Sequence, residues 1–137
     1  MAEWPWAEAF NGAIGQEQLA WLESQLTDAA EKGQRALILC HLPLLESAAS
    51  SRHLLWNRDE LLLLLRRHSP VVAAWINGHY HPGGYAFHEG VHHITVNAVL
   101  ETSPEHPTTA AVLSVFQDRL LIQGFGDCPS HVLSLPC

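Results

Sequence analysis

Two histidines in a glycine-bounded loop are the residues of this sequence best suited to holding metal ions. His79 and His81 lie between Gly78 and the Gly83-Gly84 pair. In extended backbone, positions i and i+2 face the same side with Cα atoms roughly 6.6 Å apart. Each imidazole could then hold one of two ions about 3.5–4 Å apart, the separation found in two-metal phosphatases. The glycines allow the backbone to approach closely and to turn away afterwards.

A third histidine occupies an equivalent place earlier in the chain. His41 follows the apolar run from Arg35 to Cys40, as His79 follows the run from Val71 to Asn77. If the two runs are neighbouring parallel strands, their carboxyl ends meet at one edge, where open α/β sheets bind ligands. The sequence therefore predicts a metal site made of His41, His79 and His81. The alternative, that His41 merely ends a strand beside a proline, stays open.

The elements that must position these histidines follow from periodicity and from stop signals. Apolar residues recur at helical spacing from about Gln16 to Lys32, and Gly33 supplies the stop. A second helix is expected to begin after Asn57, because Asn57 with Glu60 resembles a capping box, and to end before Ser69-Pro70. The two apolar runs are expected to be parallel strands buried on both faces, joined by a right-handed crossover.

The last third of the chain is predicted to form strands. Val91 to Asn97 alternates, Thr108 to Phe116 forms another strand, and a turn at Gln117-Asp118 leads back through Arg119 to Phe125 as a hairpin. Parallel strands followed by a hairpin imply a mixed α/β fold. The expected organisation is an N-terminal segment at 1–10, a domain at 11–126 and a tail at 127–137.

The other residues capable of chemistry have structural interpretations. His92 and His93 lie on opposite faces of a strand, so at most one approaches the site, and a buried position is expected. Trp75 is expected in the core. Cys40, inside an apolar strand, is expected to be an inert buried thiol. The histidines of loops, helix ends and the tail are expected to be solvated: His53, His68, His88, His106 and His131.

Composition excludes several classes of partner. The 137 residues include 14 Asp+Glu against 7 Lys+Arg, for a net charge of −7, which argues against a nucleic-acid partner. The apolar runs fall far short of the roughly 20 residues that span a bilayer, so no membrane partner is expected. Three cysteines without a CxxC pair fit a reduced, cytoplasmic protein.

Several segments carry a resemblance to a known family. Gly78-His79-Tyr80-His81 resembles the GHxH motif of calcineurin-like metallophosphoesterases, and Cys40-His41-Leu42-Pro43 resembles their strand-end histidine motif. Three longer segments are similar to the manganese-dependent ADP-ribose/CDP-alcohol diphosphatase branch: Phe10–Leu22, Ala74–Tyr85 and His93–Thr102. The resemblance runs from about Phe10 to Gly126. It implies an α/β fold, the C-terminal half of a metallophosphoesterase-type αββα sandwich, with a mixed β-sheet and flanking helices.

The resemblance also implies a chemistry. His41 and His79 would ligate one ion and His81 the other in a binuclear Mn²⁺ centre, with zinc or another divalent metal as an alternative. The substrates would be nucleotide diphosphates, ADP-ribose or CDP-alcohols, hydrolysed at the phosphoanhydride.

The family's first half supplies an Asp-x-His pair, a GDxxD motif and an Asn-His pair, and none of these occurs here. Mn²⁺ favours hard oxygen donors, so the chain alone is expected to be weakly active or inactive. No catalytic or substrate-binding residue is assigned.

Two other functions stay open. The chain could be a truncated, non-catalytic interaction module, since half a sandwich leaves apolar faces and unpaired edges that favour aggregation, self-association or pairing with another chain. Alternatively, His41, His79 and His81 could bind a single zinc ion with an open fourth position.

Overall fold

The computed structural model describes residues 8–105 and 108–135. Two α-helices and seven strands make up its regular structure, with two short 3₁₀ helices between them. In chain order the elements are α1 (Gln16–Glu31), β1 (Ala36–Leu39), η1 (Ser51–His53), α2 (Arg58–Arg67), β2 (Val72–Asn77), β3 (Gly84–His88), β4 (Val91–Thr95), η2 (Val99–Glu101), β5 (Ala110–Val115), β6 (Arg119–Phe125) and β7 (His131–Ser134).

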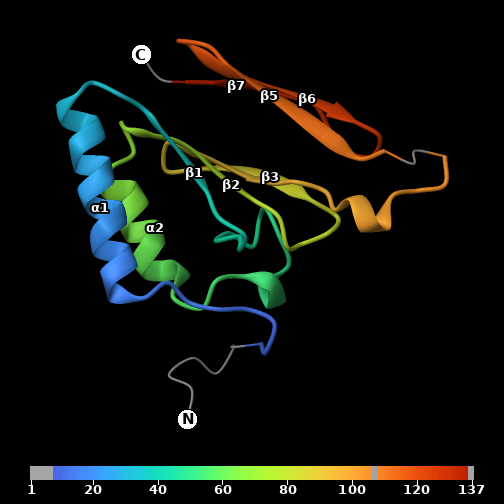
Figure 1. Ribbon diagram of the computed structural model, residues 1–137, viewed down its shortest axis with the longest axis horizontal. Coiled ribbons are helices and arrows are strands. Elements are labelled where there is room, and N and C mark those ends of the chain that lie inside the picture. Colours follow the sequence, from blue (N-terminus) through green and yellow to red (C-terminus); the bar gives the residue numbers. More distant parts are fainter. Residues whose placement is uncertain (1–7, 106–107, 136–137) are drawn as a thin grey trace.

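The elements form three layers, seen in Figure 1. The first sheet has the order β1-β2-β4-β3, in which β1, β2 and β4 are parallel and β3 runs antiparallel to β4. The helices α1 and α2 lie side by side against one face of this sheet, and the antiparallel sheet β5-β6-β7 lies over the other. The expected mixed α/β sandwich is therefore confirmed.

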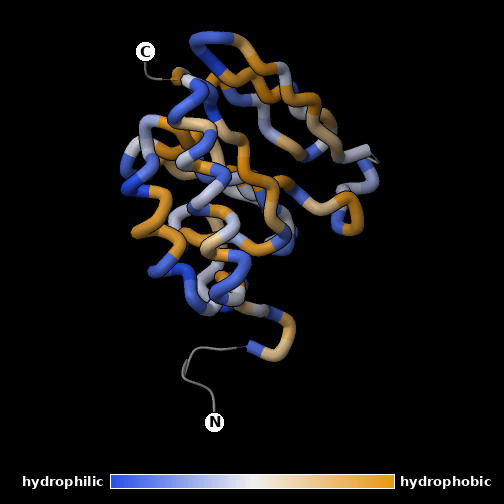
Figure 2. The backbone as a smooth tube through the Cα atoms, turned by 60° about the vertical axis from the view of Figure 1, so that its left-hand side comes forward, coloured by the Kyte–Doolittle hydropathy of each residue, from blue (hydrophilic) through white to orange (hydrophobic). Residues whose placement is uncertain are grey.

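Two hydrophobic cores hold the layers together. Between the helices and the first sheet, Leu26 and Leu61 pack with Trp75, which is 1% exposed and was expected in the core. Between the two sheets, Ile94 packs with Leu120, which is fully buried. Figure 2 shows that hydrophobic segments follow the strands of both sheets. Because β2 and β4 contribute side chains to both cores, these two strands form the rigid centre of the molecule.

Strand β1 is an edge strand, so the expectation that it is buried on both faces is wrong. It pairs with β2 alone, and Leu39 is 77% exposed. Beside it, Leu37 and Val115 line an open groove of about 1160 Å³ between the two sheets. A parallel strand made only of apolar residues, at an uncovered sheet edge, is typical of a strand that pairs with another strand on its open side.

Strand β3 was not anticipated from the sequence. It joins β4 through a two-residue turn in which Glu89 and Gly90 have φ angles of 48° and 87°. Two positive φ angles are the signature of a type I′ hairpin turn, which is usually recognised in sequences as Asn-Gly or Asp-Gly. The following strand β4 ends at Thr95 rather than Asn97, and all five of its residues are buried instead of alternating.

Two further expectations need correction. Asn57 precedes α2 but makes no side-chain capping bond, because its amide instead accepts from the Ile14 N–H at 3.0 Å and donates to the Ile14 carbonyl at 2.9 Å. Residues 131–134, expected in the tail, form β7 and place Leu133 in the core between the sheets.

No helix in the described part of the chain is long and apolar enough to cross a membrane.

Candidate functional site: a histidine cluster at the rim of the first sheet

The parallel pairing of β1 and β2 brings two of the three candidate histidines together. Leu39 is level with Ile76, and the Gly78 N–H donates to the His41 carbonyl at 3.2 Å just beyond the strands. His41 Nε2 then lies 3.1 Å from His79 Nδ1. Two side chains 38 residues apart in the sequence therefore face each other at the carboxyl rim of the sheet.

His79 has a left-handed backbone conformation, with φ at 68°. The loop is thus a turn and not extended backbone, so the expected i, i+2 geometry for His79 and His81 does not occur. A left-handed non-glycine residue costs on the order of 1–3 kcal/mol and is concentrated at functional sites. The residue in this conformation is the one whose ring lies 3.1 Å from that of His41.

His81 and His79 line one cleft. A cleft of about 340 Å³ is lined by His79 and His81 together with Phe10, His53, Tyr80, Pro82 and Glu101. His81 Nδ1 is 2.8 Å from Glu101 Oε1, and both side chains are substantially exposed. Because a carboxylate oxygen accepts, His81 Nδ1 is the donor in this contact.

His53 belongs to the cleft, although the sequence indicated a solvated loop residue. Its ring centroid is 5.5 Å from those of Phe10 and His79 and 5.2 Å from that of Tyr80. No periodicity or motif identified it, because its position follows from how the η1 helix packs on the loop after β2. Both aromatic rings and imidazoles therefore line the cleft.

The surroundings of His79 favour the neutral form of its imidazole. Burial lowers the pKa of His79 below its ordinary value, and the neighbouring His41, His53 and His81 lower this pKa further because each repels a second positive charge. A neutral ring keeps a nitrogen lone pair, which is the form that binds metals.

The His41–His79 pair has the spacing of two neighbouring ligands on one ion. Metal–nitrogen bonds of about 2.0–2.1 Å, at angles between octahedral and tetrahedral, place two ligand nitrogens roughly 2.9–3.4 Å apart, and the observed separation is 3.1 Å. Within 8–105 and 108–135, however, no group of three or more His, Cys, Asp or Glu residues is placed to hold an ion. The residues present thus fit the imidazole part of a site. They provide neither the carboxylate bridge of a manganese pair nor a three-histidine zinc site.

Of the other candidates, His92 and His93 lie in the protein interior, as expected, whereas Cys40 follows β1 and is only partly buried. His92 links the two sheets, since its Nε2 donates to the Ser134 carbonyl at 2.9 Å and its Nδ1 accepts from the Tyr85 hydroxyl at 3.0 Å. His93 is 2% exposed. Burial raises the pKa of the Cys40 thiol, which keeps this residue protonated and unreactive near neutral pH.

Comparisons with known proteins identify a group of relatives. No protein-family model matches the chain. It is 36% identical over 118 residues to a manganese-dependent ADP-ribose/CDP-alcohol diphosphatase of Xenopus laevis, covering 85% of this chain and 33% of the relative. The enzyme of the same name from Oryza sativa subsp. japonica is 39% identical over 116 residues, which cover 84% of this chain and 36% of the relative.

A solved structure agrees with these relatives. The crystal structure of a dimetal phosphatase from Danio rerio superposes with a TM-score of 0.88 at 35% identity, covering 93% of this chain and 40% of that chain. The chain thus spans about a third of the length of the curated relatives it matches.

Proposed function

Because this chain is homologous to one segment of the manganese-dependent ADP-ribose/CDP-alcohol diphosphatases, we propose that it forms the histidine-bearing part of a two-metal hydrolase site. The substrates of that site are ADP-ribose and CDP-alcohols, and the bond broken is the phosphoanhydride. The observation that carries this proposal is the 3.1 Å approach of His41 Nε2 to His79 Nδ1 at the carboxyl rim of β1 and β2.

The three histidines have distinct roles in this proposal. His41 and His79 hold one divalent ion, Mn²⁺ by relationship to the named relatives, and His81 faces the second. Bound divalent ions at such a site supply Lewis acidity toward phosphoryl oxygens and lower the pKa of water. The chain itself favours the neutral form of His79 and lines the cleft with Phe10, His53 and Tyr80.

We further propose that the chain alone hydrolyses these substrates weakly or not at all. The described residues place no carboxylate together with the His41–His79 pair in a group of three potential ligands. Without a bridging carboxylate, two dications lack the negative charge that offsets their repulsion.

An uncovered edge supports a second proposal, that the isolated chain associates through β1. Leu39 is 77% exposed beside an open groove lined by Leu37 and Val115. In the second sheet, the edge strand β5 exposes Val112 and Val115 at 53% and 62%. Edges of this kind template pairing with another chain. The same surfaces fit the interaction-module alternative.

We also propose a cytoplasmic location, and the free thiols of Cys40 and Cys128 are consistent with it.

A chimera tests the proposed function. In it, the segment of the Danio rerio phosphatase that this chain matches is replaced by the corresponding residues of this chain. We expect Mn²⁺-dependent hydrolysis of ADP-ribose that falls by about 100-fold or more in His79→Ala, because even residues that only orient a ligand contribute 10–100-fold. The matched control, His68→Ala, changes a histidine at the end of α2 and should retain the rate.

Two results would count against the proposal. One is a soluble, folded chimera without Mn²⁺-dependent hydrolysis, and the other is a His79→Ala chimera with the unmodified rate. The chain alone is assayed in parallel, and a rate comparable to the chimera's would overturn the claim of weak activity.

A further inference from the structure

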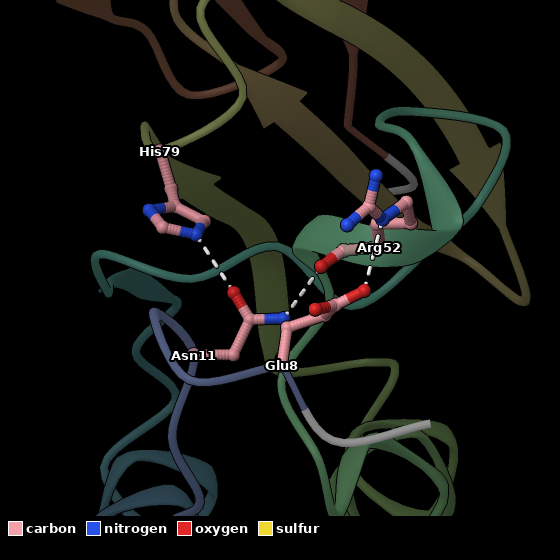
Figure 3. A network of polar contacts seen from close by, with 4 residues as sticks. All are labelled: Glu8, Asn11, Arg52 and His79. Carbon is pink, nitrogen blue, oxygen red and sulfur yellow. Dashed lines mark hydrogen bonds and ion pairs between the residues drawn. The ribbon is translucent and has the colours of Figure 1, made fainter. Parts of the chain in front are cut away.

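The side-chain amide of Asn11 has a fixed orientation beside the histidine pair. Asn11 Nδ2 donates to the Arg52 backbone carbonyl at 2.7 Å, a bond that only the amide nitrogen can make. The amide oxygen, Asn11 Oδ1, consequently faces the other way and lies 2.8 Å from His79 Nε2 (Figure 3). The nitrogen and oxygen of this amide are thus assigned by their partners.

This contact determines where His79 carries its proton. An amide oxygen accepts but cannot donate, so His79 Nε2 must be the donor. A neutral imidazole has one ring proton, and His79 Nδ1 therefore keeps its lone pair. That atom is the one 3.1 Å from His41 Nε2.

We propose that Asn11 is a positioning residue that fixes His79 in its Nε2–H tautomer and thereby presents the Nδ1 lone pair toward His41 as a metal donor. The metal part of this statement rests on the proposed function, whereas the tautomer does not. Histidine ligands generally donate their second ring N–H to an oxygen that sets both tautomer and orientation. Nothing in the spacing of the histidines identified Asn11, which lies 68 residues before His79.

The segment that carries Asn11 is anchored on both sides. Arg52, whose carbonyl holds the Asn11 amide, forms an ion pair with Glu8 at 2.9 Å (Figure 3). On the other side, the Trp56 N–H donates to the Gly12 carbonyl at 2.9 Å, and the buried Asn57 amide makes two bonds to Ile14. The segment that carries Asn11 is therefore held against the η1 helix and the residues just before α2 before any ligand binds.

The tautomer can be measured directly on the metal-free chain. Long-range ¹H–¹⁵N correlation spectra of ¹⁵N-histidine-labelled protein at pH 8 distinguish a protonated ring nitrogen from an unprotonated one. We expect His79 to be Nε2–H in the wild type. Asn11→Leu should shift His79 toward a mixture of tautomers, because leucine of similar size cannot accept. Asn11→Asp keeps an acceptor for His79 Nε2 but cannot donate to the Arg52 carbonyl, so it should favour the Nε2–H form more than Asn11→Leu does.

The matched control is Gln16→Ala, which removes an exposed amide contact to Glu60 from the same part of the chain without touching His79. It should leave the His79 spectrum unchanged. Circular dichroism confirms that each variant is folded. An Nδ1–H form of His79 in the wild type would overturn the inference, and so would a pure Nε2–H form in folded Asn11→Leu.

A titration with Mn²⁺ separates this inference from the proposed function. The Mn²⁺ concentration that broadens the His79 ring signals should rise about 10–100-fold in Asn11→Leu and return toward the wild-type value in Asn11→Asp. If Mn²⁺ never broadens the wild-type signals but Asn11→Leu still changes the tautomer, the proposed metal function fails while the positioning role stands. If broadening is unchanged by Asn11→Leu, the positioning role fails.

Discussion

The buried imidazole of His93 makes folding stability depend on pH in a defined window. His93 is 2% exposed, and among the described residues its Nδ1 has no hydrogen-bond partner. Burial, with smaller contributions from the nearby His88 and His92, lowers its pKa from 6.5 to about 4. The folded protein thus keeps this ring neutral at pH values where the unfolded chain would protonate it.

The sign and the size of the effect follow from linkage. Above pH 6.5 neither state binds the proton, so the full stability is present. As the pH falls from 6.5 to 4, the unfolded chain takes up a proton that folded His93 does not, and the free energy of unfolding decreases. At about 1.4 kcal/mol per pH unit, the His93 contribution lost over this window is about 3 kcal/mol.

Urea unfolding followed by tryptophan fluorescence measures this loss. We expect the decrease in unfolding free energy between pH 7 and pH 4.5 to be smaller in His93→Phe and His93→Gln than in the wild type, by about 2 kcal/mol. Comparing two pH values within each protein cancels any loss of packing in the variants. His68→Gln, at the end of α2, serves as the control and should keep the wild-type pH dependence. Equal pH dependence in the wild type and both His93 variants would refute this reasoning.

Two further predictions concern the backbone near the site and the open edge. Gly84→Ala should lower the unfolding free energy by more than about 1 kcal/mol, because the new methyl group would overlap the Ala48 backbone carbonyl. The control Gly15→Ala adds a methyl group with no atom within 4 Å and should change this free energy by less than about 0.5 kcal/mol. Scanning calorimetry measures both variants, and similar melting temperatures would contradict the prediction. Leu39→Lys at the β1 edge should abolish any concentration-dependent increase in mass seen by light scattering of the wild type, since a lysine disfavours edge pairing. A wild type that stays monomeric at every concentration, or association that Leu39→Lys leaves intact, would exclude pairing through β1.

The regular elements that position the site could largely be predicted from the sequence, because local signals determine them. The helix from Gln16 ends at Glu31, and Gly33 follows with φ at 62°, as its place after the last apolar residue indicated. The β5–β6 hairpin also occurs where the turn residues suggested. The approach of His41 to His79 was expected if the two apolar runs were neighbouring parallel strands, and β1 and β2 do pair in this way.

The features that could not be predicted depend on tertiary contacts. Asn57 has the position of a helix cap, but its amide bonds to Ile14, which only the folded chain brings near. Asn11 and His53 reach His79 from separate loops, and no spacing rule connects them. The exposure of Leu39 was likewise unpredictable, because an apolar run gives the same sequence pattern whether or not a neighbouring strand covers it.

The central claim is that His41 and His79 hold one divalent ion together. Paramagnetic broadening of assigned histidine ring signals by substoichiometric Mn²⁺ tests it most directly, since the effect falls steeply with distance and detects weak binding. We expect the His41 and His79 signals to broaden first, those of His68 to persist, and His79→Ala to protect the His41 signal. Equal broadening of all histidines, or broadening of His41 that His79→Ala does not change, would contradict it.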